Sequence, residues 1–249
     1  MGTYISILKY SSHESREKFK EKILELIQKY GGIPFPYKQF YIKIGSQRIR
    51  MDLKIRFREQ KTINGSPMIL VEIDGPKEVV NLDGIWEVKE KWFLTLFFYE
   101  DDEELEDIVL VIGESSKGVK TFLKNMHHLS LPRPQAIKLR FIRTSEFVEK
   151  ISKLGSLGWI WLSRITDSSL SAAGFWGKDL QSSEVVSDLL RRGAEVTALV
   201  VVNERKGLKI IISDKGSIYS QKKLAPALAA GELGELIKFF KNSGIFVFE

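Results

Sequence analysis

The stretch RIRMDLKIRFR, residues 48–58, alternates apolar and polar side chains without a break. This period of two is typical of a β-strand with one buried face, because successive side chains of a strand point to opposite sides. The predicted buried face consists of Ile49, Met51, Leu53, Ile55 and Phe57. The opposite face is almost wholly cationic and consists of Arg48, Arg50, Lys54, Arg56 and Arg58, with Asp52 as its one acid.

Turn signals on both sides of this stretch predict neighbouring strands. QFYIKIG (39–45) precedes it across Gly45 and Ser46, and PMILVEID (67–74) follows it across Asn64 and Gly65. Two successive hairpins make an antiparallel meander. The long aromatic run WFLTLFFY (92–99) is expected in the interior of the same sheet.

The segment SLPRPQ (130–135) is the best candidate linker, and the pattern changes beyond it. Strand-like and helix-like segments then alternate, including an expected helix over 145–154. We expect an α+β protein: an antiparallel β-meander with flanking helices, followed by a second mixed α/β module. The expected domains are an N-terminal β-rich basic module, residues 1–131, and a C-terminal linker-like module, residues 136–249.

Positive charge is concentrated around the opening stretch. The chain of 249 residues carries a formal net charge of +6 and has a pI of about 9.3. The window from Pro36 to Lys61 contains eight basic and two acidic residues. Its net charge of +6 equals that of the whole chain. Such a balance favours an anionic partner. The acidic run EDDEELED (100–107) is expected to be a solvated turn.

Several function classes lack their usual sequence signals. There is no cysteine, which excludes disulfides, thiolate nucleophiles and thiolate metal sites. The strings GxxxxGK[ST], GxGxxG, GxSxG and HExxH are absent, so the sequence calls for no nucleotide cofactor, esterase centre or zinc centre. No signal peptide or long apolar segment is recognisable, which predicts a cytoplasmic protein with no membrane insertion.

The cationic face predicts a nucleic-acid track. Arginines at every second position of a strand lie about 7 Å apart, and their planar guanidinium groups can bind phosphate in a two-pronged manner. Contacts of this kind bind the backbone without reading the base sequence. The predicted nucleic-acid-binding residues on this sheet are Lys43, Arg48, Arg50, Lys54, Arg56 and Arg58.

Trp176 is added to the predicted binding residues because it lies beside Phe175 between two glycines in a Gly/Ser-rich segment. An exposed aromatic ring at such a place can stack on a base or dock on a protein. It can equally pack into the core.

Two alternatives remain open at this point. The cationic face can be a solvated or protein-binding surface, with its arginines paired to the acidic run, and Asp52 favours such a reading because it would repel a phosphate. A metal-dependent nuclease of the restriction-enzyme type needs an Asp and a Glu on adjacent strands and a nearby Lys. Asp74 with Glu87 and Lys89 fits that spacing loosely, as does Asp52 with Glu72.

The C-terminal part of the chain resembles a known family. The runs GLKIIISDKGSIYSQKKL (207–224), GELGELIKFF (231–240) and NSGIF (242–246) are similar to the strand, strand, helix, glycine passage in the linker region of Argonaute proteins. Together with the N-terminal strand, helix and basic meander, the chain resembles the N-terminal and linker portion of a split prokaryotic Argonaute.

This resemblance implies a non-catalytic accessory subunit in a host-defence heterodimer. The implied protein partner is a short Argonaute with the guide-anchoring and RNase H-like domains, and the chain would complete the channel for the guide and target strands. No catalytic carboxylate set of the family matches this sequence, so we expect no enzymatic activity and no metal. A purely protein-binding scaffold remains an alternative.

Overall fold

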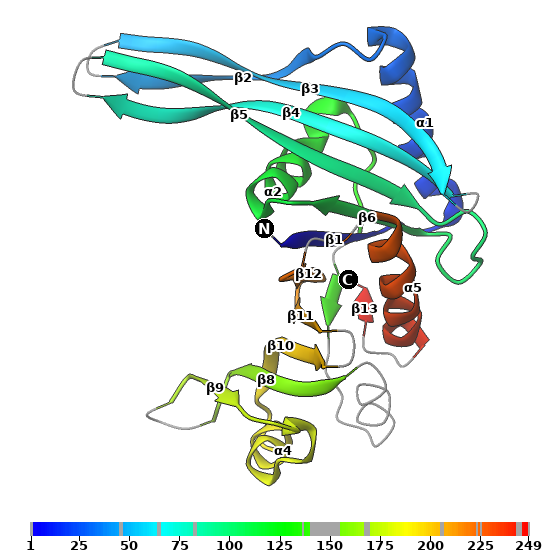
Figure 1. Ribbon diagram of the computed structural model, residues 1–249, viewed down its shortest axis with the longest axis vertical. Helices are drawn as coiled ribbons and strands as arrows, with labels where there is room; N and C mark the ends of the chain where they lie inside the picture. The colour runs from blue at the N-terminus through cyan, green and yellow to red at the C-terminus, as the bar shows by residue number, and fades with distance from the viewer. Residues whose placement is uncertain are drawn as a thin grey trace. The chain divides into compact units, whose positions relative to one another are not determined.

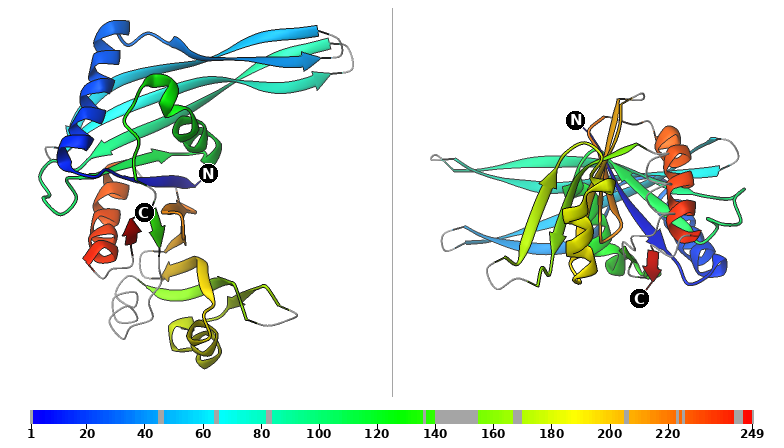
Figure 2. Two further views of the ribbon diagram at one scale, coloured as in Figure 1. Left: turned by 180° about the vertical axis from the view of Figure 1, so that it is seen from behind. Right: turned by 90° about the horizontal axis from the view of Figure 1, so that it is seen from below.

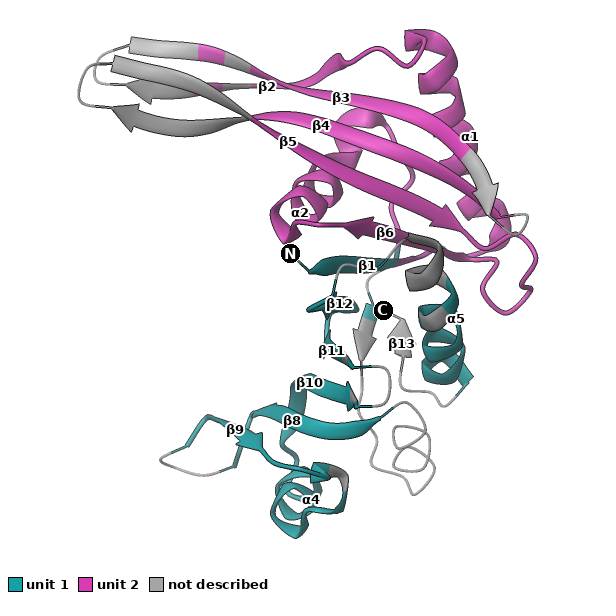
Figure 3. Cartoon of the chain, viewed as in Figure 1, with its two compact units in different colours: residues 1–7, 135–249 teal, residues 8–134 magenta. Residues whose placement is uncertain are grey.

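The computed structural model describes most of the chain, which divides into two compact units (Figure 3). Unit 2 comprises residues 8–134, and unit 1 comprises residues 1–7 and 135–249. The described residues are 2–44, 47–63, 66–81, 84–135, 137–139, 155–166, 170–204, 207–222, 224, 226–242 and 246–248.

Unit 2 is built on an antiparallel meander of long strands (Figure 1). Each strand pairs with the next one along the chain, so the order in the sheet is β2-β3-β4-β5-β6. The strands are β2 (Phe35–Ile44), β3 (Gln47–Ile63), β4 (Ser66–Asn81), β5 (Gly84–Phe98) and β6 (Ile108–Gly113). The helices are α1 (His13–Tyr30), α2 (Ser116–Asn125) and the 3-10 turn η1 (Met126–Leu129).

Both helices of unit 2 cover the same face of the meander, as the view from behind in Figure 2 shows. Phe19 of α1 lies 6.1 Å from the ring of Phe98, and Gly118 of α2 packs against Trp92. Register places Trp92 beside Ile73 and Ile73 beside Ile55, so these residues share one apolar face. This face is the core of the unit, and the side chains at alternate positions point away from it.

Unit 1 contains antiparallel sheet strands in the order β1-β12-β11-β10-β8-β9, and a separate pair β7-β13. β1 (Thr3–Lys9) pairs with β12 although more than 200 residues separate them, which is why residues 1–7 belong to this unit. The other strands are β7 (Ile137–Leu139), β8 (Ser156–Ser163), β9 (Ala172–Trp176), β10 (Glu195–Asn203), β11 (Leu208–Ser213), β12 (Ser217–Ser220) and β13 (Phe246–Phe248). The helical segments are η2 (Leu180–Ser182), α4 (Glu184–Arg191) and α5 (Pro226–Asn242).

The structure confirms the predicted fold class, an α+β protein with a β-meander. The break between Pro134 and Gln135 lies inside the predicted linker, but residues 1–7 group with the C-terminal unit and not with the N-terminal module expected for residues 1–131. The helix expected over 145–154 lies outside the described residues. None of the described helices is long and apolar enough to cross a membrane.

Candidate nucleic-acid interface

The polar face of the meander is formed mainly by β3, β4 and β5. On β3 Leu53, Ile55 and Phe57 are buried, whereas Arg50, Asp52, Lys54 and Arg58 are exposed. At these positions the apolar residues lie on the face that the helices cover, and the charged residues lie on the opposite face. This is the arrangement that the alternating sequence predicts.

Register brings acids of β4 directly beside cations of β3. Arg56 lies opposite Glu72, and Lys54 lies opposite Asp74. On the far side of β4, Lys91 of β5 lies opposite Asp74. Charges of opposite sign thus alternate across three strands, and such cross-strand pairs stabilise a sheet.

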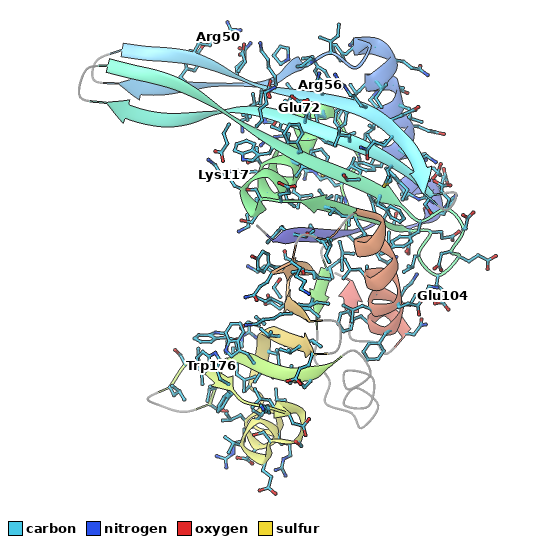
Figure 4. The ribbon with its side chains drawn as sticks, in the orientation of Figure 1. Arg50, Arg56, Glu72, Glu104, Lys117 and Trp176 are labelled. Atoms are coloured by element: carbon cyan, nitrogen blue, oxygen red, sulfur yellow. The ribbon has the colours of Figure 1, made fainter. Side chains whose placement is uncertain are left out.

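Glu72 is the centre of an ion cluster on this face (Figure 4). Arg56 Nη2 contacts Glu72 Oε2, and Lys91 Nζ lies 2.8 Å from Glu72 Oε1. Lys91 also lies 3.6 Å from Asp74 Oδ1. The side chain of Glu72 is only 7% exposed, so a buried carboxylate is compensated by two cations. Arg56 is consequently engaged within the sheet.

Arg50, Lys54 and Arg58 are the predicted binding residues whose charged groups remain available. The Nε atom of Arg50 is 3.9 Å from Asp52 Oδ1, a loose contact between two partly exposed side chains. Within the described part of the chain, neither Lys54, although it lies opposite Asp74, nor Arg58 forms an ion pair with an acidic side chain. Because they lie on one strand, the three cations form a line along the open face. We call them the β3 cations.

The remaining predicted residues are placed differently. The backbones of Lys43 and Arg48 lie opposite each other on β2 and β3, and their side chains are outside the described residues. Trp176 is not on this sheet; it ends β9 in unit 1 and is exposed.

Sequence reasoning missed three neighbours of the β3 cations. Tyr41 lies opposite Arg50, and Phe93 lies opposite Glu72; these aromatic side chains are 63% and 52% exposed. Lys91 was missed as well, since it belongs to a different strand. Only the register of β2 through β5 places these residues on one face. With them, the described part of the face carries five cations against three carboxylates.

The acidic run at 100–107 is not a freely solvated turn. Leu105 is fully buried, and the guanidinium group of Arg16, itself buried in α1, donates to Glu100 Oε1 and to the backbone carbonyl oxygen of Glu106. Lys20 also binds Glu100, and Lys9 binds Asp107. These acids pair with α1 and β1, while Arg56 and Arg50 pair with acids of their own sheet.

The predicted nuclease residues do not gather into a metal site in the described part of the chain. Glu72 is occupied by Arg56 and Lys91, and Asp74 faces Lys91. No group of three or more His, Asp or Glu side chains among the described residues could hold a metal ion. The side chains of Glu87 and Lys89 lie outside the described residues.

Comparison with known proteins does not assign a function to this face of the sheet. No protein-family model matches the chain, and no match was found among the curated proteins or the solved structures searched. The function is therefore argued from the residues themselves.

Proposed function

We propose that unit 2 binds the sugar-phosphate backbone of a nucleic acid along β3. The observation that carries the proposal is the line of β3 cations, Arg50, Lys54 and Arg58, which lie on the face opposite the helices. Phosphate groups bind to arginine and lysine side chains presented in this way, and the contacts are independent of base sequence. Arg56 contributes indirectly, because it compensates Glu72 and reduces the repulsion that a phosphate would otherwise meet.

The flanking aromatic residues support this assignment. Tyr41 and Phe93 are exposed on the same face as the cations. Surfaces that bind nucleic acid commonly combine a cationic track with aromatic rings that contact sugars or bases.

The test replaces the β3 cations together. The variant Arg50→Gln, Lys54→Gln, Arg58→Gln should bind a short fluorescent oligonucleotide about 10- to 100-fold more weakly, for all base sequences alike, because three phosphate contacts are lost. Fluorescence anisotropy measures the affinity. The control variant loses the same amount of positive charge from exposed helix positions of the unit; it carries Lys18→Gln, Lys29→Gln and Lys124→Gln. Equal affinities of the two variants would contradict the proposal.

The resemblance to split Argonautes supports a more specific role as the accessory subunit of a short Argonaute. The passage after residue 207 has the expected order of strand, strand and helix, namely β11, β12 and α5. In this proposal the chain itself does not cut; it extends the channel in which the guide and target strands lie.

The partner proposal requires its own experiment. A tagged chain purified from its native host should bring with it a protein that carries an RNase H-like domain, together with short nucleic acid. Recovery of that protein should not depend on added nuclease, since the subunits bind each other directly. Recovery of nucleic acid without such a protein would contradict the heterodimer.

The scaffold alternative is favoured by one observation, the alternation of charge around Glu72. A face that carries Asp52, Glu72 and Asp74 beside its cations can bind a protein of matching charges. In that case the triple variant would lose a protein partner, and the wild-type chain would not bind nucleic acid.

A further inference from the structure

A single row of side chains crosses all six strands of the larger sheet of unit 1. Register places each member directly opposite the next, so all of them point to the same face. The row consists of Trp176, Trp159, Val200, Ile211, Tyr219 and Tyr4. We call it the aromatic row.

The neighbouring row on the opposite face is the core of this sheet. It consists of Phe175, Ile160, Leu199, Ile212, Ile218 and Ile5, and all but Phe175 are buried. The aromatic row is different, because only Val200 is fully buried in it. Trp176 is 71% exposed at one end (Figure 4). This row is therefore partly accessible to solvent, and most so at Trp176.

Three tryptophans cluster at the end of the row, and two of them are stacked. The rings of Trp159 and Trp176 lie 24° from parallel with centroids 6.0 Å apart, and Trp161 lies 6.2 Å from Trp159. Gly174, opposite Trp161, provides the space for them. A Cβ atom there would lie 2.7 Å from Trp161 Cε3 and 2.8 Å from Trp176 Cη2. The glycine thus lets two indole rings lie close to the strand.

The charges around this face suit a polyanion. The aromatic row itself contains no acid. Lys209 is exposed on the same face, opposite Val202, and Lys178 is exposed two residues after Trp176. Neither lysine has an acidic partner in the described part of the chain. An exposed indole ring with cations nearby is the combination that single-strand binding proteins use to stack bases and hold the backbone.

We propose that the aromatic row stacks the unpaired bases of a single strand, with Trp176 as the principal contact. The proposal rests on the nucleic-acid function proposed above and adds a substrate class to it. In a duplex both faces of each internal base are covered by neighbouring base pairs, so only unpaired bases offer a face to the indole ring. The chain should prefer a single strand to a duplex of the same length.

The test compares Trp176→Leu with Trp176→Phe. The leucine variant should bind oligothymidylate and oligouridylate about 5- to 150-fold more weakly than the wild type, since stacking on one aromatic ring is lost. The phenylalanine variant should keep most of the affinity, because it retains a flat ring. Duplex binding should be the same in all three proteins. Trp176 is largely exposed, so neither substitution threatens the fold.

Three results would overturn the proposal, and they differ in what else they overturn. If Trp176→Leu binds the single strands as the wild type does, the stacking role is wrong while backbone binding along β3 can stand. If Trp176→Leu loses a protein partner but keeps its affinity for the strands, the row is a protein interface. If the wild-type chain binds neither single strands nor duplex, both this proposal and the proposed function fail.

Discussion

Arg16 shows how one residue can determine a local structure that its sequence context does not reveal. It is fully buried, and its guanidinium group binds Glu17, Glu100 and the backbone carbonyl oxygens of Tyr99 and Glu106. A lone arginine in an amphipathic helix predicts a solvated position. The structure instead uses it to hold the acidic run 100–107 against α1, because a buried guanidinium needs acceptors on several sides.

Glu100 provides a pH-dependent test of this arrangement. Partial burial raises the pKa of Glu100, but hydrogen bonds from Lys20 and Arg16 outweigh it, so the pKa is lower in the folded state than its ordinary value. The carboxylate therefore stabilises the fold above the unfolded pKa of about 4.3, and this contribution is lost as the pH falls through the folded pKa.

The variant Glu100→Gln should consequently be less stable than the wild type at pH 7, and the difference should shrink as the pH falls below about 4. Urea unfolding at both pH values measures the free energy of unfolding. Glu103→Gln serves as the control, since it removes an exposed carboxylate three residues further along the same segment. A difference between Glu100→Gln and wild type that stays constant with pH would contradict the role of the ionised carboxylate.

At the scale of elements, strand β3 was the most predictable part of the protein. Its alternating pattern predicts a strand with a buried and a charged face, and the buried positions Leu53, Ile55 and Phe57 confirm it. Its charge partners were not predictable, because Glu72 and Lys91 belong to other strands. Their positions depend on the register of β4 and β5, and a one-residue shift in register would move them to the opposite face.

The ion pairs of Glu72 with Arg56 and Lys91 lead to a prediction about nucleic-acid affinity. Glu72→Gln removes an acid from the open face and releases Arg56 and Lys91 from their shared partner. We expect tighter binding of nucleic acid, with a salt dependence steeper by about 0.7 to 0.9 in logarithmic slope for each cation that then contacts a phosphate. Anisotropy titrations of the two proteins measure both quantities.

Glu90→Gln is the matched control for Glu72→Gln, since Glu90 pairs with Lys117 of α2 on the covered side of the sheet. It should leave the affinity nearly unchanged. Weaker binding by Glu72→Gln, in a protein shown to be folded, would indicate that the acids of this face help to bind the partner, as the scaffold alternative requires.

At the scale of the whole molecule, the sequence predicts an antiparallel meander followed by a mixed module, and the structure has both. It does not predict that residues 1–7 belong to unit 1, because Thr3–Ser6 pair with Ser217–Ser220 near the other end of the chain. It likewise points to Trp176 but not to the aromatic row, whose members lie on six strands. Long-range pairing is the information that local patterns lack.

The two proposed surfaces belong to different units and have different chemistry. The β3 cations of unit 2 should contribute a salt-dependent affinity for any nucleic acid, whereas the aromatic row of unit 1 should contribute a preference for unpaired bases that salt affects little. Substitutions in one unit should therefore leave the contribution of the other unchanged.

The most direct test of the central claim is the salt dependence of duplex binding. The three β3 cations as phosphate contacts should contribute a slope of about −2.7 when the logarithm of the binding constant is plotted against the logarithm of salt concentration. The triple variant Arg50→Gln, Lys54→Gln, Arg58→Gln should lose this contribution, so its slope should be smaller in magnitude by about 2.7. A flat response of the wild-type chain, or equal slopes for the two proteins, would contradict a nucleic-acid track along β3.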